Sequence, residues 1–145
     1  MTLSIGDRLP EATLCKMGEN GPETVQLSDL TKDRKVVIFA LTGAFTGLCS
    51  SAHVPSFMRT RADFTAKGVD EVICLSVNDP FVMGAWGTST GAVAAGITFL
   101  GDADSAFTCA VGMDFTAPPV GLIKRSKRYA MLVEDGVVRV LHAEE

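Results

Sequence analysis

Two runs of mostly apolar residues, 36–41 and 72–77, constrain the fold more than any other feature of this chain. Both have the length and composition of strands that are buried on two faces. Between them, Phe57, Arg61 and Phe64 recur at helical spacing, which predicts a helix. Two buried strands joined by a helix form a βαβ unit, so the runs predict parallel neighbours in a sheet covered by helices.

Shorter runs extend this sheet. Residues 12–17 and 24–27, which are separated by turn formers, predict an N-terminal hairpin. Residues 128–133 and 137–141 flank Glu134-Asp135-Gly136 and predict a second hairpin at the other end of the chain. With a short strand at residues 97–100, the sequence indicates an α/β fold: a mixed sheet with helices on both faces, forming a single domain over residues 1–145.

The expected helices are short, apart from the one that precedes Gly68. We expect a single turn at residues 27–30 and a helix that follows the turn at residues 42–46, is kinked by Pro55 and runs to Lys67. Two more helices are expected at residues 81–86 and 105–111, with Ser105 as the N-cap of the second.

Composition excludes several classes of function. The formal net charge of -4 and pI near 5.1 provide no basic field for nucleic acid. The local run Lys124, Arg125, Lys127 and Arg128 is interpreted as a solvated face. The sequence has no apolar segment of membrane-spanning length and no signal peptide at its start, and its four cysteines are widely spaced. We therefore expect no membrane partner and a cytoplasmic, reducing location.

Cys49 is the candidate nucleophile. It follows the predicted strand at residues 36–41 through a Gly-containing turn, and so lies at the start of a helix. The free N–H groups and the dipole of a first helical turn stabilise a thiolate. A C-x-x-C motif would place a second cysteine where this chain has Thr46, so Cys49 has no neighbouring thiol for a disulfide.

These residues carry a specific resemblance. The segment Thr42-Gly43-Ala44-Phe45-Thr46-Gly47-Leu48-Cys49-Ser50, followed by His53-Val54-Pro55 and Phe57, resembles the active-site segment of the peroxiredoxins, in the type-five subfamily that includes the plant type-two enzymes. Short motifs similar to those of the subfamily occur in the same order along nearly the whole chain: Ile5-Gly6-Asp7 with Pro10, Leu75-Ser76-Val77-Asn78-Asp79, Trp86-Gly87, and Arg128-Tyr129-Ala130-Met131 with Val133, Asp135 and Gly136.

The resemblance implies a thioredoxin-like fold and a role for each matching residue. Cys49 would be the peroxidatic cysteine, Thr46 the hydroxyl that binds the peroxide, and Arg128 the guanidinium beside the thiolate. A permanent positive charge lowers a thiolate pKa and can hydrogen-bond a peroxide oxygen. Neither a metal nor an organic cofactor is expected.

Thr42 departs from the family pattern, which has proline at this position. Threonine adds an N–H, a hydroxyl and backbone freedom. One hypothesis is that Thr42 wets or loosens the pocket, which would slow peroxide reduction or change the oxidant that is accepted. The alternative is a tolerated or engineered substitution with a modest effect.

The other cysteines are expected to be structural or surface thiols. Cys74 lies inside an apolar run, and Cys15 and Cys109 fall in a predicted strand and a short helix. Since the sequence ends at Glu145, before any extension with a resolving cysteine, we expect a one-cysteine cycle. Relatives of this kind are recycled by glutathione or glutaredoxin, and the resemblance implies the same here.

Two further features keep more than one interpretation. His53, four residues after Cys49, could form a hydrolase pair or half a zinc site, although a packing role is favoured because the other required groups do not cluster. Phe45, Phe81, Met83 and Trp86 could pack in the core or form a homodimer contact, as in relatives of this subfamily.

The predicted function is therefore a thiol-dependent peroxidase that reduces hydrogen peroxide and organic hydroperoxides through a Cys49 sulfenic acid. The alternative is a variant with impaired or altered activity that acts as a thiol redox sensor or binding module. A disulfide reductase is disfavoured because C-x-x-C is absent.

Overall fold

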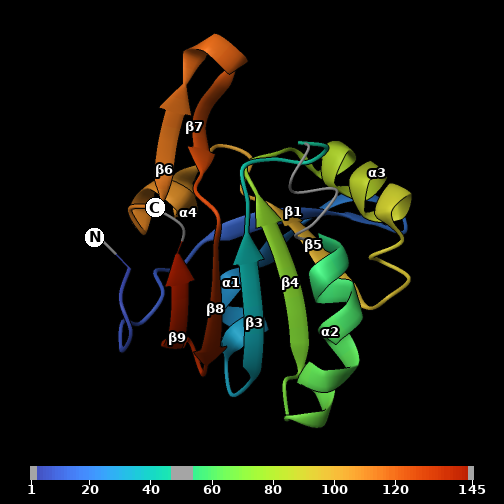
Figure 1. The fold of residues 1–145 in the computed structure, drawn as a ribbon, viewed down its shortest axis with the longest axis vertical. Helices are drawn as coiled ribbons and strands as arrows, with labels where there is room; N and C mark the ends of the chain where they lie inside the picture. The colour runs from blue at the N-terminus through green and yellow to red at the C-terminus, as the bar shows by residue number, and fades with distance from the viewer. Residues whose placement is uncertain (1–2, 47–53, 144–145) are drawn as a thin grey trace.

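The fold is built on one seven-stranded mixed sheet (Figure 1). The structure is a computed structural model that describes residues 3–46 and 54–143. The strands lie in the order β2-β1-β5-β4-β3-β8-β9. Their bounds are β1 Thr13–Gly18, β2 Gly21–Gln26, β3 Lys35–Ala40, β4 Glu71–Ser76, β5 Ile97–Gly101, β8 Tyr129–Glu134 and β9 Val137–Ala143. The β3–β4 and β4–β5 pairs are parallel and the others antiparallel, which confirms the predicted mixed sheet.

Helices cover both faces of this sheet, as predicted. Figure 1 shows α2 (Val54–Ala66) in front of the sheet and α1 (Leu27–Thr31) behind it. Side chains of α3 (Pro80–Thr90) join those of α2 in one apolar cluster, and side chains of α4 (Ala106–Ala110) join those of α1 in the other. The sheet therefore separates two apolar cores.

Strand β3 takes part in both cores. Val36, Ile38 and Ala40 pack into the α1 and α4 cluster, and Val37 and Phe39 pack into the α2 and α3 cluster. The alternation follows from the two-residue period of a strand. Full burial of a valine, isoleucine or phenylalanine side chain contributes about 1.5–3 kcal/mol to the free energy of folding. Since every residue of β3 after Lys35 is buried, the strand is a fixed support for the loop that follows it.

Both predicted hairpins are confirmed. Strands β1 and β2 pair from Thr13 opposite Gln26 to Gly18 opposite Gly21. Strands β8 and β9 join through Asp135 and Gly136, whose φ angles of 49° and 77° are those of a tight hairpin turn.

Helix α3 is longer than the predicted residues 81–86. The Val82 N–H donates to the Asp79 carboxylate at 2.8 Å, and Pro80 occupies the first turn. The helix ends at Gly91, which has a left-handed φ of 76°. A serine- and threonine-containing segment before Gly91 thus remains helical, although neither residue type favours helices.

Ser105 is the N-cap residue of α4, as expected, but its side chain does not cap the helix. Its hydroxyl donates instead to the Lys124 carbonyl at 2.6 Å. The Asp102 carboxylate accepts from the N–H groups of Phe107 and Thr108, at 3.2 and 2.8 Å. A carboxylate has two oxygens and can cap two N–H groups, which leaves the Ser105 hydroxyl available to hold another segment.

One hairpin was not predicted. Strands β6 (Asp114–Ala117) and β7 (Leu122–Ser126) pair around the short 3-10 helix η2 (Pro118–Val120). Figure 1 shows this hairpin projecting from the end of the molecule at which β3 and β4 finish.

The first part of the predicted long helix lies outside the described residues. This part includes Cys49 and His53, whereas the described helix α2 begins at Val54 and ends at Ala66. The kink at Pro55 stays a prediction. Among the helices of the described segments, none has the length and apolar character needed to cross a membrane.

Candidate active site

The candidate site begins where β3 ends. Beyond Ala40, the Leu41 N–H donates to the Leu75 carbonyl at 3.3 Å, and the chain then leaves the sheet as a loop, residues 42–46. Carboxyl ends of parallel strands are where open α/β sheets bind ligands. The loop is compact, because both the N–H and the hydroxyl of Thr46 donate to the Gly43 carbonyl, at 3.4 and 2.7 Å.

Thr46 lies half-buried in this loop. Its hydroxyl proton is already donated to the Gly43 carbonyl, so the oxygen remains available as an acceptor. The resemblance gives this hydroxyl the role of binding the peroxide. In this arrangement, Thr46 would do so by accepting a hydrogen bond from an O–H group.

Asn78 anchors the loop from the adjacent strand. Its side-chain oxygen accepts the Ala44 N–H at 2.9 Å and the Ser76 hydroxyl at 2.6 Å. The sequence analysis named Asn78 only within the run Leu75-Ser76-Val77-Asn78-Asp79 that resembles the family. The available signal was a polar residue that directly follows the second parallel strand, where its side chain faces the end of the first.

Arg128 reaches the same end of the sheet from β8. Tyr129 pairs with Ala40 in the antiparallel β3–β8 ladder, so the register places Arg128 opposite Leu41, directly before the loop. Its side chain is half-buried. The structure therefore brings together Thr42, Thr46 and the backbone of Arg128, while the predicted nucleophile Cys49 lies outside the described residues.

Thr42 is the first loop residue and is half-buried. Neither its N–H nor its hydroxyl makes a hydrogen bond to any residue of the described segments. A proline at this position would therefore remove no hydrogen bond that these segments contain.

A second arginine, which the sequence interpretation had left on a solvated face, also contacts the loop. A Cβ atom added to Gly43 would lie 2.7 Å from Arg125 Nη1, 3.6 Å from Thr46 Cγ2 and 3.8 Å from Asn78 Oδ1. Gly43 is buried, so its lack of a side chain is what lets Arg125 approach the loop. No local sequence pattern indicates this contact, because Arg125 comes from the unpredicted hairpin.

The three described cysteines differ in environment. Cys74 is fully buried in β4. Cys15 is half-buried and its thiol donates to the Gly101 carbonyl at 3.3 Å, and burial raises the pKa of this thiol. Cys109 is exposed, with its sulfur 3.5 Å from the Ser105 hydroxyl.

Tyr129 is fully buried next to Arg128, and within the described chain its hydroxyl has no hydrogen-bond partner. Burial raises the pKa of the phenol, and the negative charge of Asp102 adds to the effect. The Tyr129 hydroxyl therefore stays protonated at any physiological pH.

The four apolar residues singled out near the site divide into two pairs. Met83 and Trp86 are completely buried, so the core interpretation holds for them. Phe45 and Phe81 are 56% and 64% exposed, although the Phe45 ring centroid lies 6.4 Å from that of Trp86.

In residues 3–46 and 54–143, no three His, Cys, Asp or Glu side chains cluster as a metal site would require.

Comparison with known proteins shows what this arrangement resembles. The redoxin family matches residues 4–145. The chain is 47% identical over 148 residues to chloroplastic peroxiredoxin-2E-2 of Oryza sativa subsp. japonica, covering 99% of this chain and 66% of the relative. It is 48% identical over 122 residues to mitochondrial peroxiredoxin-2F of Arabidopsis thaliana, covering 84% of this chain and 60% of the relative. The chain thus spans less than two thirds of the length of these relatives.

A solved structure agrees with these relatives. Reduced Prx3 of Vibrio vulnificus in complex with hydrogen peroxide has a TM-score of 0.93 and 40% identity, covering 99% of this chain and 89% of that one. The thioredoxin-like fold predicted from the sequence is thereby confirmed. On the match to the redoxin family and the identity to plant relatives, this chain belongs to the peroxiredoxins, of the plant type-two-like kind.

Proposed function

We propose that the chain is a thiol-dependent peroxidase that reduces hydrogen peroxide and organic hydroperoxides at Cys49. The observation that carries this proposal is the loop at residues 42–46, which is anchored at the carboxyl end of β3 with Thr46 inside it and the backbone of Arg128 opposite its start. Cys49 follows this loop by three residues. Membership of the peroxiredoxin family supports the same chemistry.

In the proposed reaction, the Cys49 thiolate attacks one oxygen of the hydroperoxide and the O–O bond breaks. The other oxygen takes up a proton and leaves as water or an alcohol, and Cys49 becomes a sulfenic acid. Arg128 lowers the thiolate pKa and stabilises the charge that develops on the leaving oxygen. Thr46 accepts a hydrogen bond from the peroxide O–H and holds the O–O bond in line for attack.

We propose that an external thiol, glutathione or glutaredoxin, restores Cys49 in a one-cysteine cycle. The thiol attacks the sulfenic sulfur, which releases water and forms a mixed disulfide, and a second thiol then frees Cys49. Burial of Cys74 and the raised pKa of Cys15 support this assignment, because both disfavour these thiols as internal partners.

Thr42 is proposed to make the pocket wetter and less rigid than a proline would. Its half-buried N–H and hydroxyl, with no partner among the described residues, support a role in which they attract water. If this slows turnover, a thiol redox sensor becomes the second candidate function. Sustained peroxide consumption with glutathione and glutaredoxin indicates the enzyme, whereas one stoichiometric oxidation followed by arrest indicates the sensor.

A homodimer through the α3 side of the molecule is also proposed. Phe81 and Val93 are 64% and 52% exposed beside a groove of about 600 Å³ that Met17 and Gly84 also line. Exposed aromatic and apolar groups of this kind favour interfaces. Light scattering across a concentration series tests this proposal, and a monomer at micromolar concentration contradicts it.

The location is proposed to be a reducing compartment. The cytoplasm was expected from the sequence, whereas the two plant relatives are named chloroplastic and mitochondrial. Localisation of the tagged full-length protein by microscopy separates the cytoplasm from these organelles.

The decisive experiment is stopped-flow oxidation by hydrogen peroxide of the wild type and of Cys49→Ser, with Cys109→Ser as the matched control. Cys109 is exposed and lies in α4, so the same atom is exchanged on another element. Cys49→Ser is expected to abolish oxidation and turnover, and Cys109→Ser to leave both unchanged. A Cys49→Ser protein as active as wild type overturns the proposal.

A further inference from the structure

The guanidinium of Arg125 lies against the candidate site without a described partner. Its Nη1 atom approaches Gly43 so closely that a Cβ there would lie 2.7 Å away, with Thr46 Cγ2 3.6 Å from the same point. The side chain is half-buried, and within residues 3–46 and 54–143 it makes neither a hydrogen bond nor an ion pair. A partly desolvated guanidinium with unused N–H donors is an anion-binding group.

The strand that carries Arg125 is held in place on both sides of it. The Lys124 carbonyl accepts the Ser105 hydroxyl at 2.6 Å, and the Lys124 N–H donates to the Thr116 hydroxyl at 3.0 Å. Beyond Arg125, the Lys127 N–H donates to the Met113 carbonyl at 2.8 Å. These contacts fix the backbone, so only the Arg125 side chain has to be ordered when a ligand binds.

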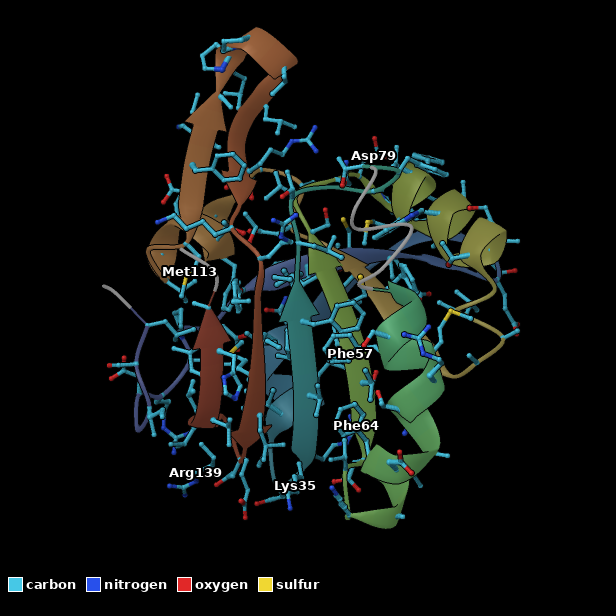
Figure 2. The ribbon with its side chains drawn as sticks, viewed as in Figure 1. Lys35, Phe57, Phe64, Asp79, Met113 and Arg139 are labelled. Atoms are coloured by element: carbon cyan, nitrogen blue, oxygen red, sulfur yellow. The ribbon has the colours of Figure 1, made fainter. Side chains whose placement is uncertain are left out.

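Asp79 and Asp102, two acidic groups at this end of the molecule, are engaged elsewhere. Asp79, which Figure 2 shows at this end of the molecule, accepts the Val82 N–H at the start of α3. Asp102 is buried and caps α4. Lys124 and Lys127, both exposed, add positive charge beside Arg125. Asp114 is exposed on the paired strand β6, opposite Ser126, but the three cationic side chains outnumber it, so the local field favours an incoming anion.

We propose that Arg125 binds a carboxylate of the reducing thiol and so positions that thiol for attack on the Cys49 sulfenic acid. This inference rests on the proposed peroxidase function. Two N–H groups of the guanidinium match the two oxygens of a carboxylate, and glutathione has a carboxylate at each end. Hydrogen peroxide has no such group, so Arg125 acts in the reduction step and not in the oxidation step.

The test compares a thiol with and without a carboxylate. The rate constant for reduction of the Cys49 sulfenic acid is measured with glutathione, with 3-mercaptopropionate and with 2-mercaptoethanol. Arg125→Gln keeps most of the side-chain length and removes the charge. Arg125→Lys keeps the charge but removes the pair of N–H groups that matches a carboxylate. Arg139→Gln is the matched control, because Arg139 is exposed at the opposite end of the molecule (Figure 2).

Arg125→Gln is expected to lower the rate constants for the two carboxylate-bearing thiols roughly 10-fold, as the loss of one charge-assisted contact predicts. Arg125→Lys is expected to fall between wild type and Arg125→Gln, and Arg139→Gln to match wild type. The 2-mercaptoethanol rate constant should stay unchanged in all three variants. An equal fall with 2-mercaptoethanol overturns the proposal, and so does a fall confined to oxidation by a carboxylate-bearing hydroperoxide.

Two further measurements separate this inference from the proposed function. Mass spectrometry after peroxide addition reports whether Cys49 is oxidised at all, which tests the peroxidase alone. S-methylglutathione cannot reduce a sulfenic acid, so its binding to the reduced protein tests the subsite alone. A shift of the Arg125 side-chain NMR signal on titration, retained in Arg139→Gln, supports the subsite. An unchanged signal at millimolar S-methylglutathione overturns it.

Discussion

The two ends of β3 differ in how their polar groups are satisfied. At the start of the strand, Arg34 pairs with Glu71 at 2.8 Å, and the Lys35 N–H donates to the Asp70 carboxylate at 2.9 Å. At the finish, Thr42 and the Arg125 side chain make no hydrogen bond within the described parts of the chain. Lys35 and Asp79 mark the two ends in Figure 2.

This difference separates polar groups that hold the fold together from polar groups that are available to bind a ligand. Paired groups at the start of β3 hold neighbouring strands and links together, and a ligand would have to break those bonds to bind. At the finish, Asn78 holds the loop, and the polar groups of Thr42 and Arg125, which make no hydrogen bond within the described segments, are available to a ligand. The comparison therefore predicts large activity effects at one end of β3 and only stability effects at the other.

Among the variants that test this comparison, the largest effect is expected from Asn78→Ala. This change removes the oxygen that accepts the Ala44 N–H and the Ser76 hydroxyl, so the loop loses its anchor on the adjacent strand. A shift of about 1 Å in reacting groups costs roughly 100-fold in rate. We expect a loss of that order in the stopped-flow rate constant for peroxide oxidation of Cys49.

Asn20→Ala is the matched control, because Asn20 is exposed in the β1–β2 turn. The same atoms are removed, and the oxidation rate should not change. If Asn78→Ala oxidises as fast as wild type while remaining folded by circular dichroism, Asn78 does not position the site.

Thr42→Pro is expected to have the next largest effect, in the opposite direction. Proline restricts φ and removes an N–H that has no partner in the described segments. We expect the oxidation rate constant to rise roughly 10-fold, about 1.4 kcal/mol of barrier, and the Cys49 pKa to fall. The pKa is measured by the ultraviolet absorbance of the thiolate during a pH titration.

Thr42→Val separates the two ways in which threonine could act. Valine removes the hydroxyl but keeps the N–H and the backbone freedom. If the hydroxyl attracts water into the pocket, Thr42→Val should recover part of the gain. Unchanged rate and unchanged pKa in Thr42→Pro would mean that the substitution is simply tolerated.

At the other end of β3, Arg34→Met should change stability without changing activity. It breaks the ion pair with Glu71 and the bond from Arg34 to the Leu30 carbonyl. Because Arg34 is partly exposed, we expect a loss of about 1 kcal/mol, measured by urea unfolding. A double-mutant cycle with Glu71→Gln isolates the pair, and a matching fall in peroxide rate would break the contrast between the two ends.

The fold was predictable from sequence where local pattern and burial agree. Strands β3 and β4 are buried on both faces and appear as apolar runs, and the Asp135-Gly136 turn specifies the β8–β9 hairpin. The β6–β7 hairpin was not predicted because β6 has only four residues, none of them fully buried, so its apolar pattern is weak. Pro118 then interrupts the strand pattern. Its place is fixed by distant contacts, such as the bond from Ser105 to Lys124.

The candidate site divides in the same way. Thr46 and Arg128 were identified from short motifs that resemble the family. The structure places Thr46 in the loop and the backbone of Arg128 opposite the start of that loop. Asn78 and Arg125 were missed because their contacts with the loop join segments far apart in the chain. For Asn78 the available signal was its position after the second parallel strand. For Arg125 there was none, since neither spacing nor residue type specifies what its side chain will meet.

Tyr129→Phe is expected to have the smallest effect. It tests what one buried hydroxyl near the site, without a partner in the described chain, costs the protein in stability. The hydroxyl is fully buried without a partner in the described chain, so its removal should stabilise the protein by about 1 kcal/mol at neutral pH. Burial raises the phenol pKa, so above about pH 10 the unfolded chain loses its proton before the folded chain does. Wild type should therefore lose stability as pH rises through that range.

Tyr129→Phe removes this contribution, so its advantage in urea unfolding should grow from pH 8 to about pH 11. The peroxide rate should not change, because Tyr129 packs in the cluster that contains Val36 and Phe107 and its proton is not available to the site. If Tyr129→Phe is less stable than wild type at pH 8, the hydroxyl has a partner. Within the described residues, Thr42 and Arg125 would then remain as groups at this end of β3 for which no hydrogen bond is seen.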